Sequence, residues 1–169
     1  IIFFELQNTE DIDLIRKPIK DLSNENDFYA ILSKLELIQI NLKNENIENI
    51  KLLYDELLDN KKLNSTYKSA IASKASYQFI DLNFKKLQKD YLETINNFIS
   101  YIDEELEVYQ GIKLELTYLV KILEVKKNKI EYLSFKEALN IYDKIINSSI
   151  VSSNIKDRVK KIHEYLSYQ

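Results

Sequence analysis

Carboxylates are the side chains of this sequence best suited to acid–base chemistry, and they are densest in the run Asp103-Glu104-Glu105-Leu106-Glu107. Acid–base catalysis by two carboxyl groups requires that burial or a neighbouring charge push their pKa values apart. Acidic side chains this closely spaced in the sequence instead predict the water-facing side of a helix. We therefore expect these residues to be solvated rather than catalytic.

The single histidine, His163, offers little further chemistry. A di-metal site in a helix bundle uses two Glu-x-x-His pairs, whereas Lys160 stands three residues before His163. The chain has no Cys and one Gly, so thiolate chemistry, a Gly-rich phosphate loop and a nucleophile elbow are excluded. We predict no enzymatic activity, no cofactor and no metal site, and we expect His163 at the surface or boundary of the last helix.

Basic and aromatic side chains gather near the C-terminus. Residues 121–169 carry 10 Lys/Arg and 6 Asp/Glu, whereas residues 1–120 carry 14 and 21. Tyrosine beside Lys and Arg is typical of protein–protein contacts, so the sequence predicts a partner-binding surface on the C-terminal helix. The candidate residues are Lys156, Arg158, Lys160, Lys161, Tyr165 and Tyr168.

Two other interpretations of the basic residues stay open, and a second basic group, Lys126, Lys127 and Lys129, shares them. The lysines could form an ordinary charged helix face with intrahelical pairs. They could also bind a phosphate- or sulfate-bearing polymer, with an affinity that falls with salt. A sequence pI near 5.4 argues against a dedicated nucleic-acid binder, so we expect no nucleic-acid partner.

The elements that position these side chains are predicted to be helices. One Gly and one Pro in 169 residues argue against β-hairpins, whose turns rely on such residues. Apolar residues recur at steps of three and four, the spacing of one helix face. The longest such stripe is Ile80, Phe84, Leu87, Tyr91, Ile95, Phe98, Ile102, Leu106, Tyr109. It predicts a long helix starting near Ser65, and Gly111 either ends this helix or lies within a longer one; we expect a break near Gly111.

The same spacing marks further helices over 28–42, 47–57, 116–133 and 155–166. Asn44-Glu45-Asn46 separates the first two, because Asn is a good N-cap. Ser134-Phe135-Lys136-Glu137 predicts a capping box that starts another helix. Together these patterns predict an all-α fold, an antiparallel helical bundle of about five to seven helices with one long central helix. We expect a single domain over 1–169, in which residues 1–23 form an N-terminal arm plus a short helix.

Small residues cluster in "SAIASKAS", from Ser69 to Ser76, at the start of the long helix. Small side chains three and four residues apart let two helix backbones approach closely. We expect an internal helix crossing here. The alternative is a shallow surface groove that admits side chains of another protein.

No apolar run approaches the ~20 residues of a membrane-spanning helix, so no transmembrane segment is predicted. The sequence contains no Met and therefore lacks a start residue of its own. We expect a processed or truncated chain from which a targeting or anchoring segment has been removed.

The composition, rich in Ile, Lys, Asn and Tyr, is typical of an AT-rich genome. With phrases such as "NENIENIKLLYDELLDNKKL" and "NIKDRVKKIHEYL", this Cys-free helical chain resembles the outer-surface lipoproteins of Borrelia-type spirochaetes. Complement-binding members, including the factor H-binding surface proteins of relapsing-fever species, are similar in size. The resemblance covers the whole chain but involves no motif, so it assigns no residue a role.

The resemblance implies a lipid-anchored protein of the cell outer surface, with the anchor upstream of Ile1. Such a protein would bind a host serum protein, a complement regulator such as factor H or another complement component, for immune evasion. The alternative is a cytoplasmic helical adaptor, or a self-associating protein that uses the Ile80–Tyr109 stripe in a coiled coil. The sequence leaves the oligomeric state open.

Overall fold

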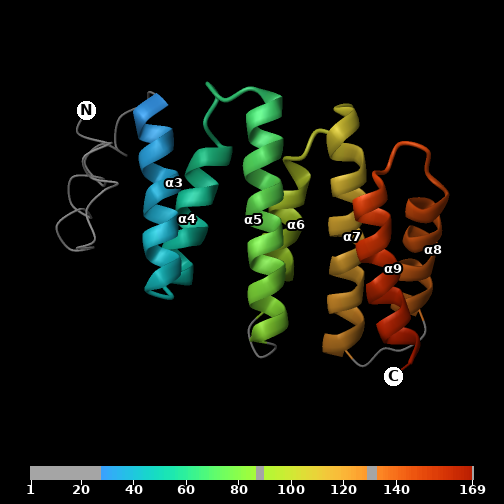
Figure 1. Cartoon of the computed structure of the whole chain (residues 1–169). Coiled ribbons are helices and arrows are strands. Elements are labelled where there is room, and N and C mark those ends of the chain that lie inside the picture. Colours follow the sequence, from blue (N-terminus) through green and yellow to red (C-terminus); the bar gives the residue numbers. More distant parts are fainter. Residues whose placement is uncertain (1–27, 87–89, 129–132, 169) are drawn as a thin grey trace. The chain divides into compact units, whose positions relative to one another are not determined.

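A computed structural model describes residues 28–86, 90–128 and 133–168 of the chain. The predicted N-terminal arm and short helix of residues 1–23 lie outside the described residues. Seven α-helices and no strand occur within these ranges. Figure 1 labels the helices. The predicted all-α fold class is therefore confirmed.

The chain divides into two compact units, of which the first ends at Lys62 and the second begins at Leu63. The first unit contains α3 (Phe28–Lys43) and α4 (Ile47–Leu58). The second contains α5 (Ser65–Lys85), α6 (Leu92–Ser100), α7 (Glu107–Asn128), α8 (Leu133–Asn147) and α9 (Ser153–Ser167). Each unit is described by itself below, and the single domain over 1–169 stays a prediction.

The turn between α3 and α4 confirms the predicted separation of two helices at Asn44-Glu45-Asn46. Glu45 has a φ of 55°, and its N–H and that of Asn46 donate to the carbonyls of Leu42 and Asn41, at 3.2 Å and 3.0 Å. This pair of bonds is a Schellman motif, which closes a helix with a left-handed residue. The Asn46 side chain then caps α4 by accepting from the N–H of Asn49.

Apolar side chains of α3 and α4 form the core of the first unit. Ile38, Ile50 and Leu58 have no exposed surface, and neither does Tyr54. Burial raises the pKa of the Tyr54 hydroxyl well above its usual value. Lys34 on α3 and Glu56 on α4 form an ion pair with 3.1 Å between Nζ and Oε2, which links the two helices at their edge.

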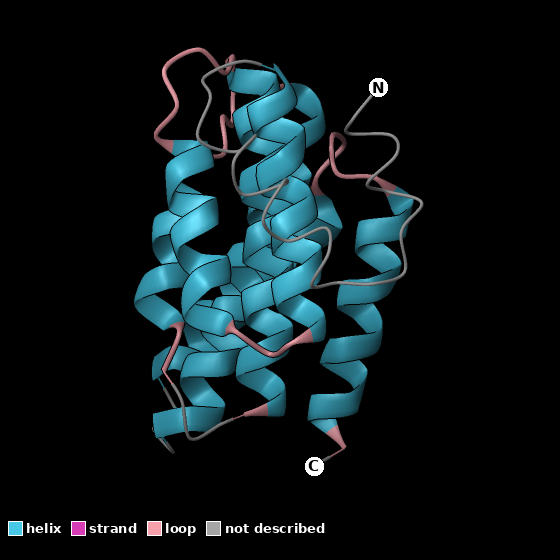
Figure 2. Ribbon diagram, turned by 90° about the vertical axis from the view of Figure 1, so that its left-hand side faces the viewer, coloured by secondary structure: helices cyan, strands magenta, loops and turns pink. Residues whose placement is uncertain are grey.

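In the second unit successive helices run in opposite directions (Figure 1), and Figure 2 shows helices and loops but no strand among the described residues. α5 packs against α6 and α7, and α7 packs against α8 and α9. Asn64 caps α5 by accepting from the N–H of Tyr67 at 2.9 Å, and α5 starts at Ser65, as predicted. α8 begins at Leu133, so Ser134 lies inside its first turn and not at the predicted capping position.

The predicted long helix from Ser65 to a break near Gly111 is wrong in its extent, because three helices occupy this range. α5 ends at Lys85, and the buried Asn83 side chain accepts from the N–H of Tyr91 at 3.1 Å. Between α6 and α7, the N–H of Asp103 donates to Ser69 Oγ at 2.9 Å. Side chains of α5 thus accept hydrogen bonds from backbone N–H groups at both interruptions of the predicted long helix.

The Ile80–Tyr109 stripe therefore does not form one continuous face. Its members Ile80, Tyr91, Ile95, Phe98 and Ile102 are buried, and the Phe79 ring lies edge-on to Tyr91 and Phe98 at centroid distances of 5.5 Å and 5.3 Å. These side chains form a core in which α5 and α6 meet. They are not available for the coiled coil with another chain considered above.

The small residues of α5 are internal, as predicted. Ser69, Ala72, Ala75 and Ser76 have no exposed surface, and Ser73 is 6% exposed. The Ser73 and Ser76 hydroxyls donate to carbonyls one turn earlier in α5, both at 2.7 Å. Because their polar groups are satisfied within the helix, these serines can be buried. The surface-groove alternative for this segment is wrong.

Gly111 lies within α7, at the place where α7 meets the start of α9. A Cβ atom on Gly111 would lie 3.3 Å from Ile155 Cδ1 and 3.5 Å from the Cα of Val151. Glycine therefore permits the close approach of these segments.

No helix in the described part of the chain has the length and apolar character to cross a membrane.

We predict that Glu45→Gly stabilises the protein by about 1 kcal/mol, because glycine adopts the left-handed conformation without the Cβ penalty. Urea denaturation followed by circular dichroism measures the change. Glu45→Ala is the control, since it removes the same carboxylate and keeps the Cβ atom. If the glycine variant is no more stable than the alanine variant, backbone strain at Glu45 is negligible.

We further predict that Gly111→Leu destabilises the protein by roughly 1–3 kcal/mol through overpacking against Val151 and Ile155. Gly111→Ala should stay within about 1 kcal/mol of the wild type, because its gain in helix propensity offsets a contact with the flexible end of Ile155. Urea midpoints of both variants test this. A leucine variant as stable as the alanine variant would show that the contact is loose.

Candidate functional site

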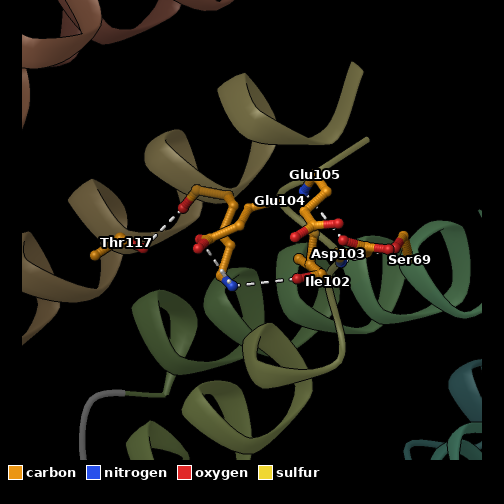
Figure 3. Close-up of polar contacts among 7 residues, drawn as sticks. Ser69, Ile102, Asp103, Glu104, Glu105 and Thr117 are labelled. Atoms are coloured by element: carbon orange, nitrogen blue, oxygen red, sulfur yellow. Dashed lines mark hydrogen bonds and ion pairs between the residues drawn. The ribbon is translucent and has the colours of Figure 1, made fainter. Parts of the chain in front are cut away.

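The carboxylates of the 103–107 run lie mainly in the connection between α6 and α7, so their predicted location on a helix face is wrong for Asp103, Glu104 and Glu105. Figure 3 shows them beside Ser69 and Ile102. Glu104 and Glu105 are exposed, as expected for solvated groups. Asp103 accepts from the N–H of Glu105 at 3.0 Å and from the Ser65 hydroxyl.

These hydrogen bonds identify Asp103 as a structural residue of the connection. The Ser65 hydroxyl, and then the backbone N–H of Glu105, lower the pKa of the Asp103 carboxyl from its usual value. Next to it, Lys113 donates to the carbonyl of Ile102 at 3.2 Å and pairs with Glu104 at 3.3 Å (Figure 3). Asp103 and Glu104 thus have partners that hold this connection in place, whereas Glu105 is exposed to solvent.

A hollow of about 500 Å³ lies beside this connection. Its lining includes Glu104 and Glu105 from the connection and Lys113, Leu114 and Thr117 from α7. The Thr117 hydroxyl donates to the carbonyl of Lys113 at 2.7 Å. The lining is mostly polar: Glu104 pairs with Lys113, and besides Thr117 the other polar side chains are Glu105 and Gln110.

His163 lies at a partly buried position on α9 and stacks on the Tyr142 ring of α8, with 4.0 Å between ring centroids and 19° between planes. This location agrees with the predicted boundary position. Among the described residues, no group of three or more His, Asp or Glu side chains is placed to hold a metal ion.

Two of the predicted partner-binding residues have internal partners instead. Lys156 donates to the carbonyl of Ser148, just beyond the end of α8, where a cation also meets the helix dipole favourably. Arg158 forms two bonds to Glu115 of α7, 3.1 Å from Nε to Oε1 and 2.7 Å from Nη2 to Oε2. Glu115 is 3% exposed, so the pair joins α9 to a buried carboxylate.

The Arg158–Glu115 pair shifts pKa values around it and neutralises a buried charge. Hydrogen bonding to Glu115 raises the pKa of Arg158 further, and the pKa of the nearby Tyr77 hydroxyl is raised by burial and by the Glu115 carboxylate. Bidentate binding by a guanidinium is among the strongest charge-assisted arrangements. Glu115 would be an uncompensated buried charge without Arg158.

The other four predicted residues are exposed. Tyr165 and Tyr168 expose 61% and 90% of their surface, and Lys160 and Lys161 are also exposed. Neither lysine forms an ion pair with a residue that the structure describes. We call Lys160, Lys161, Tyr165 and Tyr168 the α9 surface.

Lys161 and Tyr165 also line a hollow of about 330 Å³ between α7 and α9, which we call the α7–α9 groove. The apolar spacing of α9 places Ile162 and Leu166 in its walls. The complete lining consists of Phe84, Leu119, Ile122, Lys126, Lys161, Ile162, Tyr165 and Leu166. Lys126 and Lys161 are exposed at its edge, and Lys126 Nζ lies 5.5 Å from the centroid of the Phe84 ring.

Sequence patterns did not identify this groove. Phe84 and Leu119 were expected to be ordinary members of apolar stripes, and both are only partly buried at the edge of a core that contains Ile122. Lys126 and Lys127 looked equivalent in the sequence. In the structure Lys127 pairs with Asp90, whereas Lys126 borders the groove.

The fold and the site define the class of the protein only as an all-helical protein with an exposed basic and aromatic helix surface. No protein-family model matches the sequence, and neither a curated protein nor a solved structure matches it. The resemblance to spirochaete surface lipoproteins therefore stays a prediction.

We predict that Arg158→Met destabilises the protein by about 2 kcal/mol, below the 3–5 kcal/mol of a fully buried pair because the Arg158 side chain is 54% exposed. The double variant Arg158→Met/Glu115→Leu should recover most of this loss, since no unpaired carboxylate remains. Urea denaturation measures both variants. Lys160→Met is the matched control on α9, and a loss as large in this control would contradict the role of the pair.

Proposed function

We propose that this protein is a non-catalytic binding protein that contacts another protein through the α9 surface. The observation that carries the proposal is that Tyr165 and Lys161 are exposed next to an apolar groove. Exposed tyrosine beside a basic side chain and a partly open apolar surface is the composition found in the energetic centres of protein interfaces.

The partner that we propose is a host serum protein, either a complement regulator such as factor H or another complement component. The location that we propose is the outer surface of a cell, with a lipid anchor upstream of Ile1. Both rest on the resemblance in composition to spirochaete surface lipoproteins. A cytoplasmic helical adaptor is the alternative, and it would use the same α9 surface for a different partner.

Binding to a phosphate- or sulfate-bearing polymer is less well supported than protein binding. Of the four basic residues proposed for it, Lys156 and Arg158 are held by Ser148 and Glu115. Lys160 and Lys161 alone remain on the exposed side of α9, and two lysines make a weak site for a polyanion.

We predict that the immobilised chain retains a protein from serum and that Tyr165→Ala/Lys161→Glu weakens this binding by about tenfold or more. Mass spectrometry identifies the retained protein, and surface plasmon resonance with the purified partner measures the dissociation constant. Lys74→Glu, an exposed lysine on α5, is the control and should bind as the wild type does.

Two results would contradict this prediction. Equal binding by the wild type and the double variant would remove the α9 surface from the interaction. Retention of nothing from several sera would count against the host-protein partner and favour the adaptor alternative.

A further inference from the structure

Most of the residues that line the α7–α9 groove lie along α7 and α9. Its lining runs from Leu119 to Lys126 on α7, about 10 Å at 1.5 Å per residue. On α9 it runs from Lys161 to Leu166, so two helices that run in the same direction form its long sides. A groove of this length matches about two turns of a helix that lies along it.

The interior of the groove is apolar. Phe84, Leu119, Ile122, Ile162 and Leu166 supply five of its eight lining residues. These side chains belong to or pack against the hydrophobic core of α7, α8 and α9, and this packing holds the walls of the groove in place. An occupant must therefore present aliphatic or aromatic side chains, spaced by three or four residues if it is helical.

The edge of the groove is positively charged. Lys126 and Lys161 lie on opposite sides, one on each helix, and neither forms an ion pair with the residues that the structure describes. By contrast, Lys121 on α7 pairs with Glu124 and Glu137, and Lys127 pairs with Asp90. Of the described lysines on α7, Lys126 alone lacks a carboxylate partner, and Lys161 borders the same groove without one, which favours an occupant that carries acidic side chains.

We infer that the α7–α9 groove binds an acidic amphipathic helix of a partner protein, whose apolar side chains enter the groove and whose carboxylates pair with Lys126 and Lys161. This inference rests on the proposed function and specifies the segment of the partner that is recognised. Tyr165, at the edge of the groove, contacts the same helix with its ring. The charge pairing selects the partner, and the apolar contacts supply most of the affinity.

Three synthetic helical peptides of about 15 residues test the inference. The first carries Leu at positions i and i+4 with flanking Glu, the second replaces each Glu by Lys, and the third replaces both Leu by Ala. Titration into the ¹⁵N-labelled chain should show that the acidic Leu peptide binds about tenfold or more tightly than either other peptide. The shifted amides should be those around Ile122 and Ile162, and high salt should weaken the binding.

The charge-reversed variant Lys126→Glu/Lys161→Glu provides the sharper test. Both side chains are exposed, so the variant should keep the wild-type melting temperature while it prefers the basic peptide. Lys160→Glu is the matched control, because Lys160 is exposed on α9 but does not line the groove. It should retain the preference for the acidic peptide.

Several outcomes would overturn the inference. Equal binding of the acidic and basic peptides, or amide shifts confined to other helices, would exclude charge-selected binding in the groove. Binding of dodecanoate in the groove without binding of the acidic peptide would identify a site for a small amphiphile. A dimer in light scattering that Lys161→Glu dissociates would assign the groove to a second copy of this chain.

The failure of this inference can be told apart from failure of the proposed function. If a protein partner binds through Tyr165 and Lys161 but the acidic peptide neither binds nor competes, the inference fails and the proposed function stands. If the acidic peptide occupies the groove while no protein partner is retained, the groove assignment stands and the proposed function fails.

Discussion

The packing of α9 along α7 is the constraint on which the candidate site depends. Two contacts and then the groove occur one after another along α7 and α9. Near their beginnings Gly111 admits the side chain of Ile155. One turn further along α7, Glu115 binds Arg158. Beyond this pair lie the residues that line the groove. α7 and α9 therefore pack against each other near their beginnings, and the groove lies further along, where side chains no longer fill the space between them.

This order has a consequence for the exposed face of α9. An amphipathic helix can direct only one stripe of side chains toward its neighbours. In α9 that stripe includes the buried Ile155 and Val159, and the Arg158 bond fixes how the helix is rotated. Tyr165 and Lys161 consequently lie at the edge of the stripe, where each lines the groove and is also exposed to water. Recognition by these side chains requires little further ordering of the backbone.

Much of the fold could be predicted from the sequence because helix periodicity and caps are local properties. Asn46 and Asn64 act as N-caps as expected, and the apolar positions of α9 were assigned correctly. The interruptions of the long stripe were missed, since residues on consecutive short helices kept the spacing of three and four. The N–H of Tyr91 donates to the Asn83 side chain of α5, and the N–H of Asp103 in the next connection donates to Ser69 Oγ. Such bonds depend on tertiary structure and leave no periodic signal.

The candidate site was predictable only in part, for a related reason. Lys156, Arg158, Lys160 and Lys161 look alike in the sequence, because each is a basic residue on one amphipathic helix. Their different roles are determined by distant partners, the carbonyl of Ser148 and the carboxylate of Glu115. Residues of α5 and α7 also line the groove, so inspection of α9 alone could not identify it. A partner-binding surface formed by several helices is in this sense a property of packing, even when its exposed anchors are visible in the sequence.

The pKa shifts of the described residues have structural causes. Those of Tyr77 and Arg158 occur together around Glu115, and the others lie elsewhere. The pKa of Asp90 is lowered by Lys127, the pKa of Lys121 is raised by Glu137, and burial raises the pKa of Tyr118 to about 12. These groups lie in separate places on α7 and its neighbours, and their shifts favour the charge state that each already has near neutral pH. Acid–base catalysis needs a group that can change its charge at the working pH, and these shifts move the groups away from that condition.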